Sequence, residues 1–232
     1  MRKLAMLLVL GCGGGPSHGS VAIGDLGTEI GASYCMKEFA CCTDAEVMMD
    51  FGSFTVGGQP ITTEPQCEMF YSGFVGALIS SDYMTSIANN RITYDGGAAG
   101  ACIDAIDALS CSDFGSKNID GSTNCKAFVI PLVDAGGGCA QSYECKSNNC
   151  VGATTQPLKD GACVELPGSG QKCTFDCATG LFCDFSMSST CQPTRANGGT
   201  CSSGSNCTSG FCNNGSTSSG TCADKPARCD GR

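Results

Sequence analysis

The chain of 232 residues contains no tryptophan and one histidine, and only 15% of its residues are charged. Because a serine or cysteine hydrolase needs a base beside its nucleophile, a single histidine, His18, argues against that chemistry. The low charge also excludes a coiled coil or a charged disordered tail. A glycine-rich phosphate loop after a strand and the acid spacing of an EF-hand are both missing. The sequence therefore predicts a protein that is not an enzyme.

Paired acidic residues offer little support for an active site. Asp104 and Asp107 lie three residues apart in an expected helix. A glycosidase needs two carboxyl groups in a cleft that raises the pKa of one of them. On an outward helix face, we interpret this pair as solvated surface. Asp113-Phe114-Gly115 matches three letters of a kinase motif, but every other kinase element is missing, so we interpret the match as chance.

Basic residues are scarce relative to acidic ones. The chain has 13 Lys and Arg residues against 22 Asp and Glu residues, a formal net charge of −9. Nucleic acid attracts clustered basic side chains to its phosphates, so it is not an expected partner. The acids are scattered along the chain, which we interpret as a contribution to solubility.

Long apolar runs are also missing, since a membrane-spanning helix needs about 20 residues. The amino terminus, residues 1–11, places two basic residues before seven apolar residues and a final glycine. This order of charged, apolar and small residues is typical of an export signal. The glycine-rich residues that follow predict a flexible tether over residues 12–30.

The run Val9-Leu10-Gly11-Cys12 resembles a bacterial lipobox. The resemblance implies that residues 1–11 are removed as a signal peptide and that Cys12 is lipidated. Its acyl chains exceed the roughly two signals that stable anchoring needs. The resemblance therefore implies a membrane partner and a place in the cell envelope, where Gly13 favours the outer membrane. The alternative is an ordinary secretory signal, in which Cys12 has no special role and the protein is secreted.

Cysteine, in contrast, is abundant, with 21 residues. Setting Cys12 aside leaves an even number, which in an oxidising compartment predicts ten disulfides. A zinc site needs closely paired thiolates, often with histidine, but Cys-x2-Cys does not occur and the one histidine lies in the expected tether. We therefore expect no metal and no cofactor. The cysteines expected in disulfides are Cys35, Cys41, Cys42, Cys67, Cys102, Cys111, Cys125, Cys139, Cys145, Cys150, Cys163, Cys173, Cys177, Cys183, Cys191, Cys201, Cys207, Cys212, Cys222 and Cys229.

Composition divides the chain into two segments. Over residues 31–134 apolar residues follow helical spacing, whereas over residues 135–232 glycine, serine and cysteine dominate. The first segment predicts a bundle of three or four helices whose thin core needs disulfides. The expected elements are helices over Ser33–Cys42, Thr43–Asp50 (with a capping box of Thr43 and Glu46), Thr63–Asn90 (with a capping box of Thr63 and Gln66) and Ala98–Leu109, and a turn or hairpin over Phe51–Ile61.

The second segment is repetitive. Cys139 and Cys201 each open a block with the spacing Cys-x5-Cys-x4-Cys, and both blocks close with Gly-x-Cys. A variant block, Cys-x3-Cys-x5-Cys-x7-Cys, lies between them. The blocks cover about residues 136–163, 168–191 and 198–222 and predict knotted, loop-rich units whose cores are disulfides. The expected fold class is therefore small and disulfide-rich, with an N-terminal disulfide-stapled α-helical domain followed by these cysteine repeats.

The blocks also carry a resemblance, in the runs Gly-Gly-Gly-Cys139, Glu-Cys145 and Lys-Ser-Asn-Asn-Cys150 and their repeats. These runs resemble the amino-terminal cysteine-rich domain of Dickkopf proteins and, more loosely, EB-type and EGF-like modules. With the lipobox and the helical segment, the whole arrangement is similar to cysteine-rich surface lipoproteins of myxobacteria and related deltaproteobacteria. The resemblance implies the fold of the repeats. It does not imply the signalling role of animal Dickkopf proteins, because no second, colipase-like domain is identified.

The distribution of cysteines predicts a link between the two segments. Of the twenty cysteines after Cys12, seven fall before residue 135 and thirteen after it. If all of them pair within the molecule, at least one disulfide crosses the boundary. Cys125 and Cys229 are the natural candidates, because they lie outside the helices and the blocks. Alternatively, Cys125 belongs to the first block, or Cys229 pairs with another molecule.

Two kinds of function remain. The first is a surface-anchored binding, adhesion or structural module, in which rigid blocks present loops to a partner protein or polysaccharide. The loops Thr154–Lys159 and Phe185–Ser189 are the expected points of contact. The second is a protease inhibitor, because a disulfide-rigid loop loses little entropy when it docks. Lys159 and Arg195 are the residues expected at its cleavable position.

Overall fold

The computed structural model of the chain describes residues 17–116, 125, 128–155, 158–174, 176–185, 189–213, 219–226 and 228–229. The expected signal peptide and Cys12 lie outside them. Within the described part, every α-helix precedes residue 117, and the later sheets have only two or three strands. Ten disulfides cross-link the chain. The protein is therefore small and disulfide-rich, with helices followed by small sheets, as the sequence predicts.

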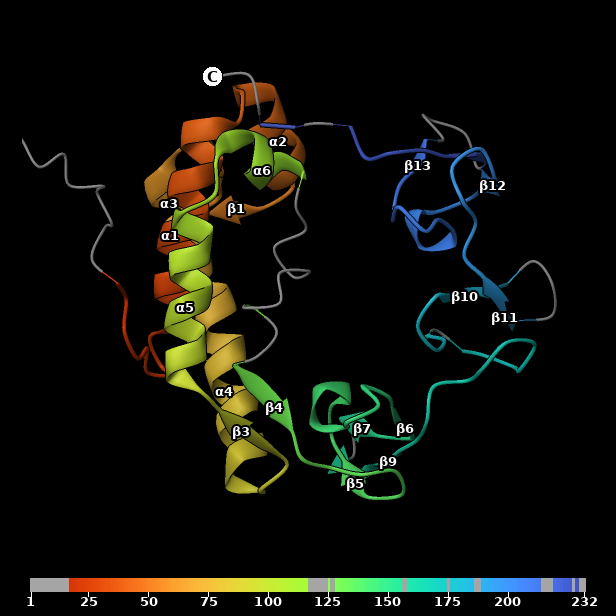
Figure 1. The fold of residues 1–232 in the computed structure, drawn as a ribbon. Helices are drawn as coiled ribbons and strands as arrows, with labels where there is room; N and C mark the ends of the chain where they lie inside the picture. Colours follow the sequence, from red (N-terminus) through yellow and green to blue (C-terminus); the bar gives the residue numbers. More distant parts are fainter. Residues whose placement is uncertain are drawn as a thin grey trace, which may run out of the picture.

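A column of packed helices forms the first half of the molecule (Figure 1). Its main members are α1 (Leu26–Cys41), α3 (Glu64–Phe70), α4 (Gly76–Ala88) and α5 (Gly96–Asp107). Helix α1 contacts the other three. Two glycines of α1 allow this close packing, because a Cβ on Gly27 would lie 2.3 Å from the Cα of Gly76, and one on Gly31 would lie 2.3 Å from the Cβ of Tyr71.

The segment before α1 is packed against α5, which corrects the expected tether over residues 12–30. Helix α1 begins at Leu26 rather than at Ser33. The face of α1 that packs on its neighbours carries glycine at positions 27 and 31. The apolar spacing from which a helix is predicted is therefore interrupted in this part of the sequence. Upstream of the helix, Val21 is buried, and its N–H donates to the carbonyl oxygen of Gly96 at 3.0 Å. The described residues from 17 onward therefore belong to the folded body.

Both expected capping boxes are present. At the start of α2 (Asp44–Phe51), the backbone N–H of Thr43 donates to the Glu46 carboxylate at 2.8 Å, and the Thr43 hydroxyl accepts from the Glu46 N–H. Thr63 and Gln66 form the same arrangement at the start of α3. These local signals place both helix starts where the sequence predicts them.

The segment between these helices and the helix that follows agree in part with expectation. The turn or hairpin expected over Phe51–Ile61 is a hairpin, formed by β1 (Thr55–Val56) and β2 (Gln59–Pro60). The helix expected over Thr63–Asn90 is divided into α3 and α4 by a π-helical turn at Tyr71–Val75. Gly73 lies within this turn, and a Cβ at this position would meet no atom within 4 Å.

A short helix and a two-stranded sheet are not predicted by the sequence. Helix α6 (Cys111–Ser116) has too few residues to show a helical period. Strand β3 (Ile92–Tyr94) pairs with β4 (Val129–Pro131), and strands so far apart along the chain leave no local turn signal. The β3–β4 sheet leads from the helices to the first block (Figure 1).

Each cysteine block is built on a small antiparallel sheet. The strands are β5 (Gly138–Cys139), β6 (Cys150–Val151) and β9 (Gly161–Cys163) in the first block, β10 (Leu181–Asp184) and β11 (Thr190–Pro193) in the second, and β12 (Thr200–Cys201), β13 (Cys212–Asn213) and β14 (Gly220–Cys222) in the third. In the first and third blocks the last strand lies in the middle of the sheet. The first block also carries a hairpin of β7 (Thr154–Thr155) and β8 (Leu158–Lys159).

The three blocks share a disulfide pattern and a turn. In each, the first cysteine pairs with the third and the second with the fourth. Each block opens with a glycine at positive φ, namely Gly136, Gly170 or Gly198, and its N–H donates to the carbonyl oxygen of the block's last cysteine at 2.8 Å. Residues with a side chain rarely adopt this conformation. The shared turn explains the glycine that precedes each block.

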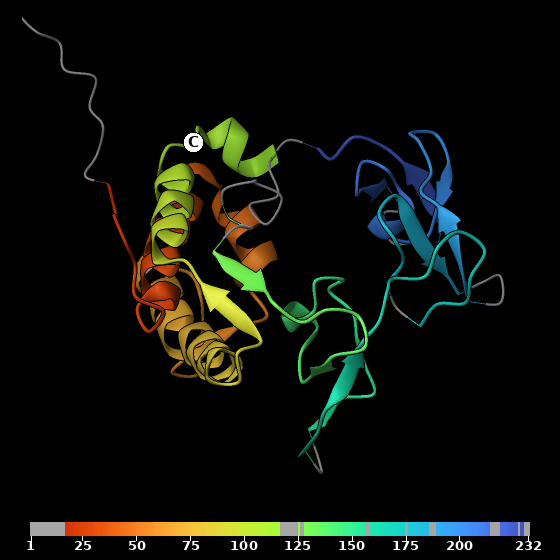
Figure 2. The same ribbon diagram turned by 60° about the horizontal axis from the view of Figure 1, so that its bottom comes forward.

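The blocks follow one another in an arc that returns to the helices (Figures 1 and 2). The first block lies near β4, at one end of the column. The second and third blocks follow, and the chain then runs back toward α2 and α6 at the other end of the column (Figure 1). There Cys229 is bonded to Cys42. Both ends of the arc are therefore attached to the helical half of the protein.

Candidate interaction surface

All twenty cysteines that follow Cys12 are paired, so the predicted disulfides are confirmed. One bond, Cys42–Cys229, joins the helical segment to the cysteine-rich segment, and Cys125 pairs with Cys102 rather than with a block. The link expected between the two segments is therefore present, through Cys229. The remaining pairs are Cys35–Cys67, Cys41–Cys111, Cys139–Cys150, Cys145–Cys163, Cys173–Cys183, Cys177–Cys191, Cys201–Cys212 and Cys207–Cys222.

The first junction, between the helices and the first block, centres on a buried carboxylate. Glu144 is 1% exposed, and it accepts hydrogen bonds from the Ser86 hydroxyl at 2.6 Å and from the Ala140 N–H at 2.5 Å. The Arg91 guanidinium lies 3.5 Å from Glu144 and also pairs with Asp160. Because a buried charge is costly without partners, this network fixes the first block to α4 and to the start of β3.

The second junction attaches the far end of the arc to α1 and α2. Arg228 donates two hydrogen bonds to the Asp50 carboxylate, at 3.0 and 2.9 Å. The N–H of Cys229 donates to Oε1 of Glu46 at 2.9 Å, and its sulfur is bonded to Cys42. A two-point arginine–carboxylate pair is stronger and more directional than a single hydrogen bond. The junction thus combines a covalent bond with a specific ion pair.

Two glutamates at the second junction have pKa values shifted in opposite directions. Burial, together with the nearby Asp50, raises the pKa of Glu38 from 4.5 to about 7. Hydrogen bonds from the N–H groups of Cys229 and Thr43 lower the pKa of Glu46 from 4.5 to about 2. Hydrogen bonding to a carboxylate favours the charged form, whereas burial favours the neutral form. Near neutral pH, Glu46 is therefore ionised while Glu38 is partly protonated.

A groove of about 740 Å³ lies between the first and second blocks. Its walls include the apolar residues Val151, Val164 and Pro167 and the charged residues Lys172 and Asp176. Val151 is 51% exposed, so it offers apolar surface at the groove. A concave site of this size, with apolar walls and a few polar groups, suits ligand binding.

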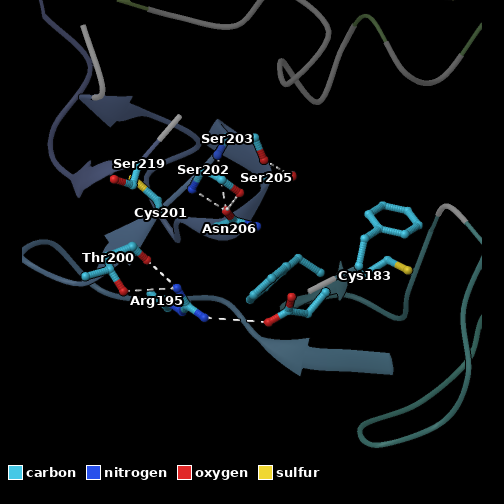
Figure 3. Close-up of a pocket in the computed structure, with 12 residues that line it drawn as sticks. Cys183, Arg195, Thr200, Cys201, Ser202, Ser203, Ser205, Asn206 and Ser219 are labelled. Atoms are coloured by element: carbon cyan, nitrogen blue, oxygen red, sulfur yellow. Dashed lines mark hydrogen bonds and ion pairs between the residues drawn. The ribbon is translucent and has the colours of Figure 1, made fainter. Parts of the chain in front are cut away.

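A smaller and more polar groove, of about 320 Å³, lies between the second and third blocks (Figure 3). Arg195 reaches across it, with its guanidinium 3.7 Å from Asp184, 5.4 Å from the ring centre of Phe182 and hydrogen-bonded to the carbonyl oxygen of Thr200. These contacts hold Arg195 between the blocks. An inhibitor needs a protruding cleavable residue, so Arg195 does not occupy the position expected for that role.

The two loops expected to contact a partner lie on the outside of the blocks. The β7–β8 hairpin covers most of Thr154–Lys159, and it projects from the first block (Figure 2). Lys159 is exposed and lies at the base of this hairpin, paired with Thr154. In the other loop, Phe185 is 63% exposed directly after β10. Residues 156–157 and 186–188 lie outside the described part of the chain.

His18 interacts with the acidic pair of α5, which corrects the interpretation of that pair as solvated surface. The Nδ1 atom of His18 lies 2.8 Å from Asp104 and 3.8 Å from Asp107. The hydrogen bond to Asp104 raises the pKa of His18 above its ordinary value of 6.5 and lowers the pKa of Asp104. The pair therefore serves as an attachment point for the segment that precedes α1.

Sulfur atoms gather closely inside the blocks. In the first block, for example, the sulfurs of Cys139, Cys145 and Cys150 lie within 4.8 Å of one another. Each of them is bonded to another cysteine, so none has a free thiolate to offer to a metal ion. These sulfurs stabilise the blocks by cross-linking, where little apolar core is available.

Sequence reasoning missed both junctions. Glu144 and its partner Ser86 are 58 residues apart, and Arg228 and its partner Asp50 are 178 residues apart. Contacts over such distances leave no spacing pattern. The one local hint is that Arg228 directly precedes Cys229, the cysteine already expected to reach the first segment.

Comparison of the chain with protein-family models, with curated proteins and with solved structures finds no match. Among the described residues, no helix has the length and apolar character needed to cross a membrane. The many disulfides are typical of an extracellular or secreted protein. The geometry that bears on function is therefore the arc of blocks, with its two grooves and its two junctions.

Proposed function

We propose that the chain is an exported, non-catalytic binding or structural protein whose three blocks act as knotted, Dickkopf-like repeats, held at the outer membrane by a lipid on Cys12. The observation that carries the proposal is the attachment of the arc at both ends. A surface that is already rigid loses little entropy when it binds a partner. The arc is thus suited to present its grooves to a surface protein or a polysaccharide.

The pairing of the cysteines supports the anchor. Every other cysteine of the chain is bonded within it, which leaves Cys12 without a cysteine partner. The intact mass of membrane-extracted protein, measured before and after reduction and alkylation, tests this part of the proposal. We expect an acylated amino terminus at Cys12 and twenty thiols that react only after reduction. A chain without lipid would contradict the anchor and favour a secreted protein.

The groove between the first and second blocks is where we expect a partner to bind. The substitution Val151→Asp places an unpaired charge on its apolar wall, and we expect it to weaken binding about tenfold. The measurement is binding of labelled protein to purified cell-surface polysaccharide and to intact cells of the producing organism. Met69→Asp is the matched control, because Met69 is 53% exposed, close to the value for Val151, and lies on α3, which takes part in neither junction. Equal binding by both variants and the wild type would exclude this groove.

A protease inhibitor is the second candidate, and the projecting β7–β8 hairpin favours it. Lys159 is exposed there, so it is accessible to a protease that cleaves after basic residues. A panel of such proteases tests this candidate. Inhibition that is lost in Lys159→Ala but kept in Lys172→Ala would support it. The absence of inhibition by the wild type would remove it.

A further inference from the structure

The C-terminal end of the arc lies in a site assembled from helices α1, α2 and α6. In addition to its two hydrogen bonds with Asp50, Arg228 donates to the carbonyl oxygen of Glu46 at 3.4 Å. The side chains of Arg228 and Asp50 are only 30% and 29% exposed, so water and salt screen their attraction incompletely. The N–H of Cys229 then reaches the Glu46 carboxylate. None of these contacts uses the sulfur of Cys229.

The shape of the site also fits the backbone of this segment. Gly115 of α6 lies so close that a Cβ there would be 1.4 Å from the carbonyl oxygen of Arg228. Cys229 has a φ of +59°, a conformation that a residue with a side chain keeps only when its surroundings hold it. Behind the ion pair, Glu38 is 1% exposed, and its Oε1 has no hydrogen-bond partner among the described residues. Whenever Glu38 is ionised, its charge attracts the Arg228 guanidinium, which lowers the pKa of Glu38 against the larger effect of burial.

Two adjacent cysteines lie at this site. Cys41 and Cys42 are both buried, and only one of them is bonded to Cys229. Cys41 pairs with Cys111, 70 residues away, whereas Cys42 pairs with Cys229, 187 residues away. The entropy of loop closure depends on the length of the loop, which is nearly the same for either partner of Cys229. Something other than loop length must therefore direct Cys229 to Cys42.

We infer that the site formed by Glu46, Asp50 and Gly115 binds the Arg228–Cys229 segment before Cys229 is oxidised, and thereby selects Cys42 as its partner. The ion pair of Arg228 supplies the attraction. The hydrogen bond from the Cys229 N–H orients the residue so that its sulfur faces Cys42. The ligand of this site is the chain's own C-terminal segment, whatever partner the arc binds.

The covalent step then follows ordinary thiol–disulfide chemistry. The thiols of Cys42 and Cys229 lose two electrons and two protons in total as their S–S bond forms. A small-molecule or protein disulfide takes up these electrons and protons, its own S–S bond breaks, and it leaves as two thiols. Both cysteines are buried in the closed form, so the exchange takes place before the site has closed fully.

Oxidative refolding of the full chain tests the inference. The reduced chain is refolded with oxidised and reduced glutathione, and the partner of Cys229 is mapped by mass spectrometry of non-reduced peptides. We expect Arg228→Ala to lower the ratio of the Cys42–Cys229 bond to all other states of Cys229 about tenfold. Arg228→Lys keeps the charge without the two-point geometry and should give an intermediate ratio. Lys146→Ala, which removes an exposed ion pair with Asp134 far along the chain from Arg228, is the control and should leave the ratio unchanged.

Asp50→Asn alters the same ion pair from the opposite side, so the result does not depend on one substitution. The disulfides inside the blocks, measured in the same digest, report whether the rest of the chain has refolded. Loss of the Cys42–Cys229 bond in both variants supports the inference, whether Cys229 is then found on glutathione, on Cys41 or on a second copy of the chain. Formation of this bond at the wild-type ratio in both variants overturns it.

Discussion

Glu144 shows how one side chain can serve both its own block and the contact between two parts of the molecule. It caps the short turn Ser142–Glu144 and also accepts from Ser86 on α4. The third block has Asn206 at the equivalent place, where it caps a turn of its own block. The neutral amide of Asn206 is sufficient to cap this turn. Glu144 also has a charged partner, because Arg91 pairs with it across the first junction. The difference between the two blocks thus reflects what each one contacts.

Replacing Glu144 should weaken the first junction strongly. Glu144→Ala leaves the Ser86 hydroxyl and the Arg91 guanidinium without a buried partner, and we expect the free energy of unfolding to fall by about 3–5 kcal/mol. Urea unfolding with the disulfides intact measures this change. Asp160→Asn, at a side chain that is 52% exposed, is the control and should cost less than about 1 kcal/mol. Equal effects of the two substitutions would show that the buried network has no special importance.

The second junction should lose stability as the pH rises, because of Glu38. Its pKa in the folded protein, about 7, exceeds its ordinary value of 4.5. The folded state therefore keeps a proton that the unfolded chain releases, so stability falls as the pH rises from 4.5 through 7. The full shift of the Glu38 pKa corresponds to a loss of about 3 kcal/mol in the free energy of unfolding. Urea unfolding of Glu38→Gln, which cannot ionise, should show this amount regained at about pH 8 and little change at about pH 4.

Glu46 provides an internal comparison for this experiment. Its pKa is lowered to about 2, so it stays ionised over the whole range in which Glu38 titrates. The contribution of ionised Glu46 to the stability of the folded state is lost only in stronger acid, as the pH falls from 4.5 toward 2. A stability profile for Glu38→Gln that rises and falls with pH as the wild type does would assign the effect to another group.

At the scale of elements, helix α1 occupies the centre of the column because it carries glycine where it crosses its neighbours. The Cβ introduced by Gly27→Ala would lie 2.3 and 2.8 Å from the Cα and N atoms of Gly76. Backbone atoms cannot rotate away as a flexible side chain can. We therefore expect Gly27→Ala to lower the free energy of unfolding by about 1–3 kcal/mol in urea titrations.

Gly73→Ala is the matched control for this prediction. A Cβ on Gly73 would meet nothing within 4 Å, although the residue also lies in a helical stretch. Alanine has a higher helix propensity than glycine, so this variant should be as stable as the wild type or more stable by up to about 1 kcal/mol. If Gly27→Ala were equally stable, the helices of the column would be able to move apart at little cost.

The blocks are joined to the elements before them by a repeated backbone contact. Val133 forms a parallel bridge with Cys145 of the first block, and Arg195 forms the same bridge with Cys207 of the third. The N–H of Val133 donates to the backbone carbonyl oxygen of Glu144, and the N–H of Arg195 donates to the backbone carbonyl oxygen of Asn206. Because the contact uses the backbone, the side chains at these two positions are free to differ. One of them is the arginine that lines the groove of Figure 3.

On the scale of the whole molecule, the helices and the arc of blocks form a closed ring, which we call the circuit, because both ends of the arc are attached to the helices. The chain leaves the helices through β4, and Cys229 closes the circuit on Cys42, 187 residues earlier. A disulfide stabilises a protein mainly by restricting its unfolded chain, and the restriction grows with loop length. The other disulfides already shorten this loop, so its effect is smaller than the sequence separation alone suggests.

Opening the circuit should enlarge the molecule without unfolding it. The variant Cys42→Ser/Cys229→Ser/Arg228→Ala removes both the covalent bond and the ion pair of the second junction. We expect its radius of gyration in small-angle X-ray scattering to increase and its free energy of unfolding to fall by about 2–4 kcal/mol. Cys102→Ser/Cys125→Ser removes a bond that closes only 23 residues within one segment, and it should leave the radius unchanged. An unchanged radius in both variants would mean that other contacts hold the arc.

Much of the local structure was determined by the sequence alone. The two capping boxes, the hairpin between them and most of the helical spans follow from neighbouring residues, whose side chains and backbone interact within one turn. The even number of cysteines after Cys12 predicted that they pair, and the division into seven and thirteen predicted a bond between the two segments if all of them pair within the molecule. These predictions succeed because each depends on spacing or on number, both of which are visible along the chain.

Only the tertiary structure decided which distant residues meet. It selected Cys42 for Cys229, placed Arg228 on Asp50 and brought Glu144 to Ser86. It also showed that the segment before α1 packs on α5, where glycine allows close approach but leaves no apolar pattern. Partners so far apart are chosen by charge, shape and available space in three dimensions. A linear sequence carries the residues for such contacts, but the contacts themselves exist only once the chain has folded.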